Sequence, residues 1–217
     1  MTIIKLPEPI KRGGMPLYEA LTNRKSCRKI ATQDLSMEEL SNILWCAYGY
    51  NREGRRTAPS SHNSQEFDLY VAIEQGTYLY NPEDHSLELK FDEDLRAFCG
   101  LQDFVASAPL TIIFVANRDK IKGKDERGVT ETIYVDTGFI SQNIYLYCAS
   151  ESLANVVRAM IDKEALSKKL HLSDNTGQEE PRKHTPHHQQ AGKRECPLQG
   201  HLQEQKLKVR NRPDKNI

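Results

Sequence analysis

Long apolar runs, net charge of either sign and paired cysteines are all missing from this 217-residue sequence. No run approaches the roughly 20 apolar residues that a membrane-spanning helix needs, and the N-terminus lacks the apolar core of a signal peptide. The balanced charge argues against a general nucleic-acid or membrane binder. Five scattered cysteines without a Cys-x-x-Cys pair indicate reduced thiols. These absences predict a cytoplasmic protein with one good-sized domain.

Two well-known site motifs are also missing. No Gly-x-Gly-x-x-Gly follows a strand pattern, so a dinucleotide-binding fold of the Rossmann type is not supported. No Gly-x-Ser-x-Gly occurs, which removes the nucleophile elbow of the α/β-hydrolases. The chemistry must therefore be sought in less familiar patterns.

The segment from residue 175 to the end has few apolar residues. Only seven of its 43 residues are apolar and none is aromatic. It carries 9 Lys+Arg and 5 Asp+Glu, a net of +4, whereas residues 1–174 carry 21 and 25, a net of −4. Such a segment buries too little surface to offset its backbone entropy. We expect a domain at 1–174 and a disordered tail at 175–217. Deletion of residues 176–217 should therefore leave the melting temperature of the domain nearly unchanged.

The tail also holds four histidines and a cysteine, namely His184, His187, His188, Cys196 and His201. Zinc sites use such ligands, but at a regular spacing on a scaffold, which this tail lacks. A basic tail can also touch nucleic acid non-specifically. A solvated tail explains the composition as well, so we predict no metal site and no specific nucleic-acid partner.

Residue periodicity predicts a mixed α and β domain. The clearest helix covers 36–48, where Ser36 and Glu39 form a capping-box pattern and Gly49 is a stop. Alternating apolar residues predict a strand at 67–73, and the run at 110–117 predicts a strand buried on both faces. The remaining predictions are a helix after Pro16, a hairpin at 76–90, a helix apolar on nearly every side at 134–152, a strand at 154–160 and a helix at 162–172.

The stretch "NRKSCRK" places Arg24, Lys25, Arg28 and Lys29 around Ser26. The cations can be a solvated helix end, where the helix dipole stabilises them mildly. They can also form a phosphate site, because arginines bind phosphate oxygens in pairs and a serine adds a hydroxyl. The Arg-x-Ser-x-Arg spacing is short, and the two interpretations stay open on these residues alone.

The stretch "APSSHNSQ" lies in a loop at 51–65 that is rich in residues that bend the backbone. Its polar side chains offer several donors and acceptors, which suits the polar edge of a heterocycle such as a flavin. An ordinary surface turn is the alternative. His62 is either a donor to a ligand or a solvent-exposed loop histidine.

Taken in order, these segments resemble the FMN-dependent nitroreductase family, and in particular its thiazoline/oxazoline-dehydrogenase-type subgroup. The resemblance covers most of residues 13–172 and rests on "GGMPLYEALTNRKSCRKI", on the 35–80 segment with "APSSHNSQ", on "APLTIIFVA" and on "DTGFISQNIYLYCASESLANVVRAMIDKEAL". It implies an α+β fold with a central, mostly antiparallel sheet flanked by helices. It also implies a homodimer with FMN at the subunit interface and NAD(P)H as co-substrate.

The family's motifs can be carried over residue by residue. Arg24, Ser26 and Arg28, with Lys25 among them, match the motif that binds the FMN phosphate and ribityl chain. Pro59, Ser60, Ser61 and Asn63 match the loop that lines the flavin ring from the partner subunit. The implied function passes hydride through FMN to a small acceptor such as a quinone, a nitroaromatic or an azoline, with no general acid or base assigned.

Three positions depart from the family pattern. Ser64 stands where relatives often have a large aromatic residue, and Ser152 stands where glycine is usual. After Asp174 the chain runs into the polar tail in place of the family's terminal strand. The last departure leaves an alternative open, a truncated relative without turnover that acts at most as a flavin-binding or interaction protein.

Overall fold

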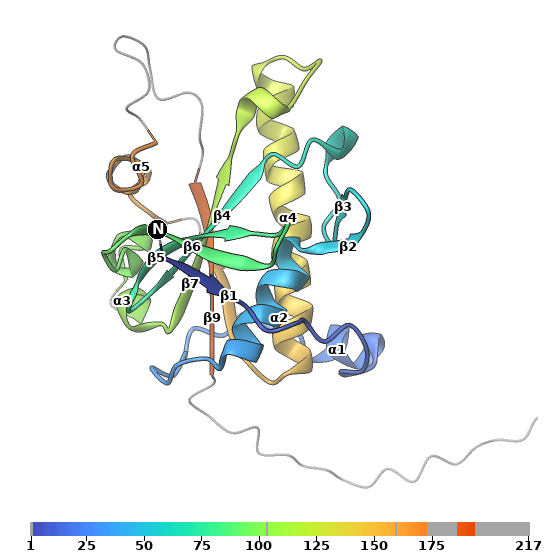
Figure 1. Ribbon diagram of the computed structural model, residues 1–217, viewed down its shortest axis with the longest axis vertical. Coiled ribbons are helices and arrows are strands. Elements are labelled where there is room, and N and C mark those ends of the chain that lie inside the picture. The colour runs from blue at the N-terminus through green and yellow to red at the C-terminus, as the bar shows by residue number, and fades with distance from the viewer. Residues whose placement is uncertain (1, 103, 159, 173–185, 194–217) are drawn as a thin grey trace, which may run out of the picture.

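The computed structural model describes residues 2–102, 104–158, 160–172 and 186–193 (Figure 1). Its centre is a seven-stranded sheet in the order β1-β6-β5-β4-β7-β9-β8, in which every neighbouring pair is antiparallel. The strands are β1 (Ile3–Lys5), β4 (Phe67–Ile73), β5 (Gly76–Asn81), β6 (Ser86–Phe91), β7 (Leu110–Ala116), β8 (Ala154–Arg158) and β9 (Pro186–Gly192). A separate hairpin pairs β2 (Tyr50–Arg52) with β3 (Arg55–Arg56).

Helices flank this sheet, which confirms the predicted α+β class. They are α1 (Leu17–Asn23), α2 (Met37–Tyr48), α3 (Phe104–Ser107), α4 (Glu126–Ser150) and α5 (Lys163–Lys169), with short 3-10 turns η1 (Ser61–Asn63), η2 (Arg96–Cys99) and η3 (Arg118–Lys120). In the described part of the chain, no helix is long and apolar enough to cross a membrane.

The strand β7 is buried along its whole length, as its uninterrupted apolar run predicts. Its alternate side chains point to opposite faces of the sheet. Ile112 and Phe114 join the core shared with α2 and α4, whereas Ile113 and Val115 join a second core with Leu166 of α5. The sheet is therefore covered on both faces in this region.

The helix α2 begins with the predicted capping box. The Glu39 N–H donates to Ser36 Oγ at 3.2 Å, and the Ser36 N–H donates to Glu39 Oε2 at 2.8 Å. Both bonds satisfy N–H groups that the first turn leaves without helical partners. The helix ends at Gly49 as expected and buries Ile43 and Leu44 completely.

The helix α4 is longer and more polar than the sequence suggests. It begins at Glu126, because the Asp125 carboxylate accepts the Gly128 N–H at 2.8 Å and caps the first turn. The prediction of a start near residue 134 is therefore wrong. The helix also buries polar side chains, among them Asp136 and Ser141, and exposes Tyr134, Val135 and Phe139, so it is not apolar on every side in this structure.

Ser152 follows α4 with φ of 57°, in the left-handed region. Glycine enters this region without cost, whereas a side chain is strained there. The position therefore favours glycine because of its backbone conformation. The turn leads directly into β8.

The expected absence of a strand after residue 174 is wrong. Pro186–Gly192 forms β9, which lies between β7 and β8 and pairs with both. Gln189 and Gln190 are fully buried there, and their amides donate to Asn155 Oδ1 at 2.8 Å and to the Val105 carbonyl at 3.1 Å. The low apolar content of this segment predicted disorder wrongly. In a central strand, hydrogen bonds to both neighbouring strands satisfy the backbone polar groups, and side-chain partners can satisfy polar side chains. The rest of the predicted tail, including His184, Cys196 and His201, lies outside the described residues.

Candidate functional site

The cationic segment leaves α1 and runs along the outer edge of the sheet. The Cys27 N–H donates to the Asn155 carbonyl of β8 at 2.8 Å, and the Ala31 N–H donates to the Lys193 carbonyl at 2.8 Å. These bonds fix the backbone of the segment along the outer edge of β8, whose other edge pairs with β9. They hold Arg28 and Lys29, which lie between the two bonded residues, beside this edge.

Tyr145 of α4 ties this segment to the helix and the sheet. Its hydroxyl lies 2.7 Å from Ser26 Oγ and accepts the Val157 N–H at 3.1 Å. The Arg24 guanidinium carbon lies 5.3 Å from the centre of the Tyr145 ring, within the range of a cation–π contact. One aromatic side chain therefore orients two of the predicted phosphate ligands.

The cations of this segment have no carboxylate to balance them. Within the described ranges, Arg24, Lys25 and Arg28 form no salt bridge. A fourth cation, Arg158 at the end of β8, is 8% exposed and has no acidic partner either. Its pKa is lowered by burial and then by the positive charge of Arg28. The local potential is positive, which favours an anion.

The Ser/Asn loop is held by internal hydrogen bonds. The Ser61 N–H donates to Asp136 Oδ2 of α4 at 3.0 Å, and the Gln65 N–H donates to Ser60 Oγ at 3.0 Å. The Asn63 amide donates to the Gly54 carbonyl at 3.1 Å. Pro59 is exposed at the start of the loop. The loop is thus fixed to α4 and to the β2–β3 hairpin.

The backbone of this loop is strained. His62, Asn63 and Gln65 have φ of 53°, 56° and 47°, all in the left-handed region. Non-glycine residues persist there only where the surroundings hold them, and such residues cluster at functional sites. His62 is exposed, as one of its two interpretations requires. The Ser64 hydroxyl donates to Glu66 Oε2 at 2.7 Å. Ser64, which stands where relatives often have a large aromatic residue, therefore contacts the buried Glu66.

Two carboxyl groups lie beneath the loop. Glu66 is fully buried, Asp136 is 4% exposed, and Glu66 Oε1 has no hydrogen-bond partner. Burial raises the pKa of Glu66, the Ser64 hydroxyl opposes the shift, and Asp136 raises it further. The raised pKa favours the neutral form of Glu66 next to a second buried carboxyl group, which reduces the repulsion between the two. This arrangement anchors the base of the loop.

The two predicted groups of ligands do not meet within one chain. Tyr145 contacts the cationic segment and Asp136 contacts the Ser/Asn loop, and nine residues of α4 separate them. At a rise of 1.5 Å per residue this separation is about 13 Å. Figure 1 shows α1 at the lower end of α4 and the β2–β3 hairpin farther up. Each group is assembled, but a single chain does not join them.

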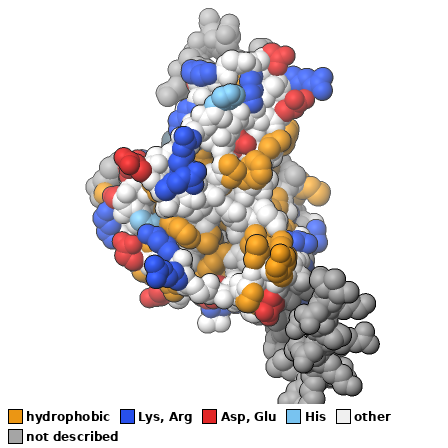
Figure 2. Space-filling model, turned by 90° about the vertical axis from the view of Figure 1, so that its right-hand side faces the viewer, with side chains coloured by type: hydrophobic (Ala, Val, Ile, Leu, Met, Phe, Trp, Pro, Cys, Tyr) orange, Lys and Arg blue, Asp and Glu red, His pale blue; other side chains and the backbone are white. Residues whose placement is uncertain are grey.

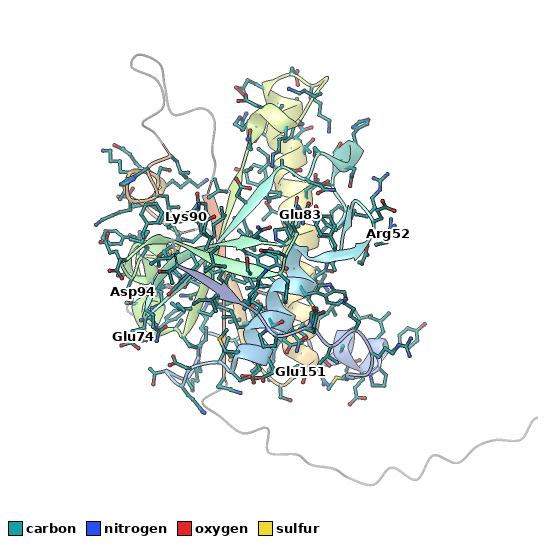
Figure 3. All side chains as sticks on the ribbon, in the orientation of Figure 1. Arg52, Glu74, Glu83, Lys90, Asp94 and Glu151 are labelled. Carbon is teal, nitrogen blue, oxygen red and sulfur yellow. The ribbon has the colours of Figure 1, made fainter. Side chains whose placement is uncertain are left out.

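A cavity of about 520 Å³ lies between α2, α4 and residues 10–14. Its lining includes Trp45, Cys46, Tyr147 and Glu151, and Figure 3 shows Glu151 at the lower end of α4. Burial raises the pKa of Cys46 to about 12, so its thiol stays protonated. None of the predicted site residues lines this cavity, which is therefore separate from both groups.

Sequence reasoning missed Tyr145, Arg158, Glu66 and Asp136. Arg158 did carry a signal, because a cation at the end of the apolar stretch "ANVVR" is unusual in a buried strand. Tyr145 carried none, since its partner Ser26 is 119 residues away in the sequence. Such contacts arise only from the tertiary fold.

Comparison with known proteins decides the family. The nitroreductase family model matches residues 21–181. "Putative nitroreductase MJ1384" from Methanocaldococcus jannaschii is 34% identical over 161 residues, which are 68% of this chain and 81% of that protein. The chain belongs to the nitroreductase family. This membership places it among the nitroreductase-family oxidoreductases.

Solved nitroreductase-family structures share the fold. A "putative nitroreductase" from Ralstonia eutropha JMP134 has a TM-score of 0.81 and 38% identity, with 90% of each chain covered. A "putative nitroreductase in complex with FMN" from Desulfovibrio desulfuricans has a TM-score of 0.58 and 18% identity, with 85% of this chain and 89% of that chain covered. At 18% identity the second likeness shows the fold alone. The nitroreductase-like α+β architecture is thus shared by both.

Proposed function

We propose that this nitroreductase-family chain is an FMN-dependent oxidoreductase that works as a homodimer. The observation that carries the proposal is the cationic segment, whose side chains have no carboxylate partner among the described residues. The terminal phosphate of FMN is a dianion that would neutralise them. The charge of the cationic segment therefore suits the phosphate group of FMN.

Arg24, Lys25, Ser26 and Arg28 would hold the phosphate. Arginine binds phosphate oxygens through parallel N–H donors, which gives direction as well as charge compensation. The contact with Tyr145 fixes Ser26 in place, at 2.7 Å between hydroxyl oxygens, and so reduces the entropy lost on binding. When bound, FMN would supply the hydride chemistry between NAD(P)H and an acceptor.

A second subunit would complete the site with Pro59, Ser60, Ser61 and Asn63. Two features support this part of the proposal. Asp136 and Tyr145, the α4 residues that contact the two ligand groups, lie nine positions or about 13 Å apart along the helix. Apolar side chains are also exposed on α1 and α4, where Tyr18 is 86% exposed and Phe139 is 43% exposed. Figure 2 shows apolar side chains gathered in the middle and lower parts of the face it displays. Burying such a surface would stabilise a dimer.

The acceptor is a quinone, a nitroaromatic or an azoline-type ring, the last being the substrate expected of the thiazoline/oxazoline-dehydrogenase-type subgroup. The polar groups of the Ser/Asn loop would orient the flavin ring, and the chain's contribution is binding, positioning and exclusion of water. We assign no general acid or base. NAD(P)H as the co-substrate and the cytoplasmic location stay predictions.

The purified full chain tests the proposal directly. We expect a yellow protein with flavin absorbance, a mass of two chains, and bleaching by NADPH or NADH under anaerobic conditions. Arg28→Ala should lower FMN affinity about 10-fold or more, because charge-assisted hydrogen bonds contribute about 1.5–3 kcal/mol. Arg127→Ala is the matched control, since Arg127 is exposed and pairs only with Glu131. A protein that stays colourless after incubation with FMN would overturn the proposal.

The alternative of a truncated, inactive relative loses its main support. It depended on a missing terminal strand, whereas β9 occupies the sheet between β7 and β8. The buried and unpartnered Gln189 Oε1 and Gln190 Oε1 still weaken that strand. The flavin content of the purified chain decides between the two functions.

A further inference from the structure

Two buried arginines of this chain have the same exposure but opposite surroundings. Arg96 and Arg158 are each 8% exposed. Arg96 donates from Nε to Asp94 Oδ1 at 2.9 Å, from Nη2 to Asp94 Oδ2 at 2.7 Å, and from Nη1 to the Ala108 carbonyl at 3.0 Å. Arg158 forms no hydrogen bond with any described residue, and its Nε is fully buried. Only Arg96 has the partners that a buried cation requires.

The chain is shaped closely around the Arg158 side chain. The guanidinium carbon lies 4.9 Å from the centre of the Phe104 ring. A Cβ added to Gly100 would lie 3.1 Å from Arg158 Nη2 and 2.7 Å from Val105 Cγ2, so glycine is required for this approach. The ring and the close backbone fix the plane of the guanidinium. They supply little charge compensation, because a cation–π contact is much weaker than an ion pair.

A second cation makes this position still less favourable. Arg28 lies near enough to lower the pKa of Arg158, beyond the larger effect of burial. An unpaired buried charge is expensive, and a methionine or leucine would fill the same volume without that cost. Only Nε of Arg158 is sealed from solvent, which leaves the terminal nitrogens accessible. The arrangement is complete as a binding site once an anion supplies the missing acceptor oxygens.

We propose that Arg158 and Arg28 together bind an oxyanion of the phosphate class, with Arg158 as a ligand that the family motif does not include. The phosphate can belong to FMN or be free in solution, and both present the same oxygens. The flavin source rests on the function proposed above, whereas the site itself does not. Arg158 thus extends the phosphate site from the cationic segment to the end of β8.

Inorganic phosphate is the probe for the site. The melting temperature of the full chain, freed of flavin, is measured against phosphate concentration at constant ionic strength with chloride. We expect phosphate to raise it, because a ligand that binds only the folded state stabilises that state. Arg158→Met should lower phosphate affinity about 10–100-fold, as expected for loss of a charge-assisted contact. Without phosphate, this variant should melt at or above the wild-type temperature.

Arg96→Met is the matched control. It removes an equally buried arginine that has its partners, so it should lower the melting temperature and leave the response to phosphate unchanged. If Arg158→Met does not fold, Arg158→Lys is the variant to measure, because it keeps the positive charge but loses the bidentate geometry of the guanidinium. Its phosphate affinity should be several-fold lower than that of the wild type. A wild-type chain that ignores phosphate, or Arg158 variants with wild-type phosphate affinity, would overturn the proposal.

Flavins distinguish the two sources. If the anion is the FMN phosphate, saturation with FMN removes the response to inorganic phosphate, and Arg158→Met lowers the affinity for FMN but not for riboflavin. If the response persists in the FMN-loaded protein, the site takes free phosphate. A chain that binds phosphate through Arg158 but never FMN leaves this site standing and overturns the flavoenzyme function. A chain that binds FMN equally well with and without the Arg158 side chain, and that shows no role of Arg158 in binding phosphate, supports the flavoenzyme function and overturns the Arg158 site.

Discussion

The hydroxyl oxygens of Tyr145 and Ser26 lie 2.7 Å apart, although 119 residues separate them in the sequence. The contact joins the C-terminal part of α4 to the cationic segment, and the same hydroxyl accepts the Val157 N–H from β8. It is the point at which helix, segment and sheet edge meet. Its removal tests how the proposed phosphate site is positioned.

Tyr145→Phe should weaken FMN binding about 5–10-fold, because it removes one hydrogen bond, typically about 1 kcal/mol, that fixes Ser26. The aromatic ring beneath Arg24 remains, so the melting temperature should change little. Titration with FMN and thermal unfolding measure the two effects. Tyr70→Phe on β4 is the control. An unchanged FMN affinity would show that the orientation of Ser26 does not matter for binding.

Glu66→Gln should make the protein more stable at neutral pH. The pKa of Glu66 is raised above 4.5, chiefly by burial, so between 4.5 and the folded pKa the native state binds more protons than the unfolded state. Stability therefore falls as pH rises through that window. Glutamine carries no charge, and its amide can accept from Ser64 and donate to Asp136.

The measurement is urea unfolding of Glu66→Gln at several values between pH 4.5 and pH 8. The variant should show a flatter dependence on pH, with a gain of about 1 kcal/mol at the upper end, the usual size of a net hydrogen bond. Glu19→Gln on the exposed face of α1 is the control. A variant that is less stable than wild type at pH 8 would contradict a raised pKa of Glu66.

Removal of β9 should unfold the domain. A chain that ends at residue 193 keeps the strand, whereas a chain that ends at residue 185 exposes the facing edges of β7 and β8 and removes buried Gln189, Gln190 and Ala191. The shorter chain should lack a cooperative melting transition by circular dichroism. The longer one should melt within a few degrees of the full chain. Equal stability of both would show that the strand adds nothing.

Asn155 and Gln189 should behave as a coupled pair. The Gln189 amide donates to Asn155 Oδ1 at 2.8 Å, and each side chain leaves its other polar atom buried without a partner. Asn155→Leu leaves the Gln189 amide with only the Ser141 carbonyl, at 3.3 Å, and Gln189→Leu leaves Asn155 Oδ1 without its donor. Each change alone should cost about 1–3 kcal/mol. The double variant should recover much of that loss.

Urea denaturation of the four proteins gives the coupling energy. As a control, Asn155→Leu combined with Ser36→Ala at the distant cap of α2 should be additive, because the two sites share no partner. Strict additivity for the Asn155 and Gln189 variants would contradict direct coupling of the two amides.

The sequence predicted those elements whose signals are local. The capping box of Ser36 and Glu39 and the alternation in β4 lie within a few residues, so they can be recognised without tertiary information. The start of α4 was missed because charged residues around Asp125 resemble a surface loop. Secondary structure was thus recovered best where a cap or a periodicity was unambiguous.

The sequence failed where distant partners determine the outcome. Gln189 and Gln190 resemble a solvated tail until Asn155, Val105 and Thr111 are seen to satisfy their amides. The cation that ends "ANVVR" is unusual in the sequence, but only the structure shows that Arg158 has no acidic neighbour among the described residues. Residue type left two interpretations open for the cationic segment and for the Ser/Asn loop, and the family resemblance favoured FMN binding. Their roles in binding FMN stay predictions.

The position of β9 also constrains how the chain folds during its synthesis. The strands β7 and β8 cannot complete their pairing until residue 192 has left the ribosome, because the strand that joins them is made last among the described elements. Until then the nascent protein presents two open sheet edges, which are sites for aggregation. Cells that make this protein would therefore benefit from chaperones that shield it until β9 has been made.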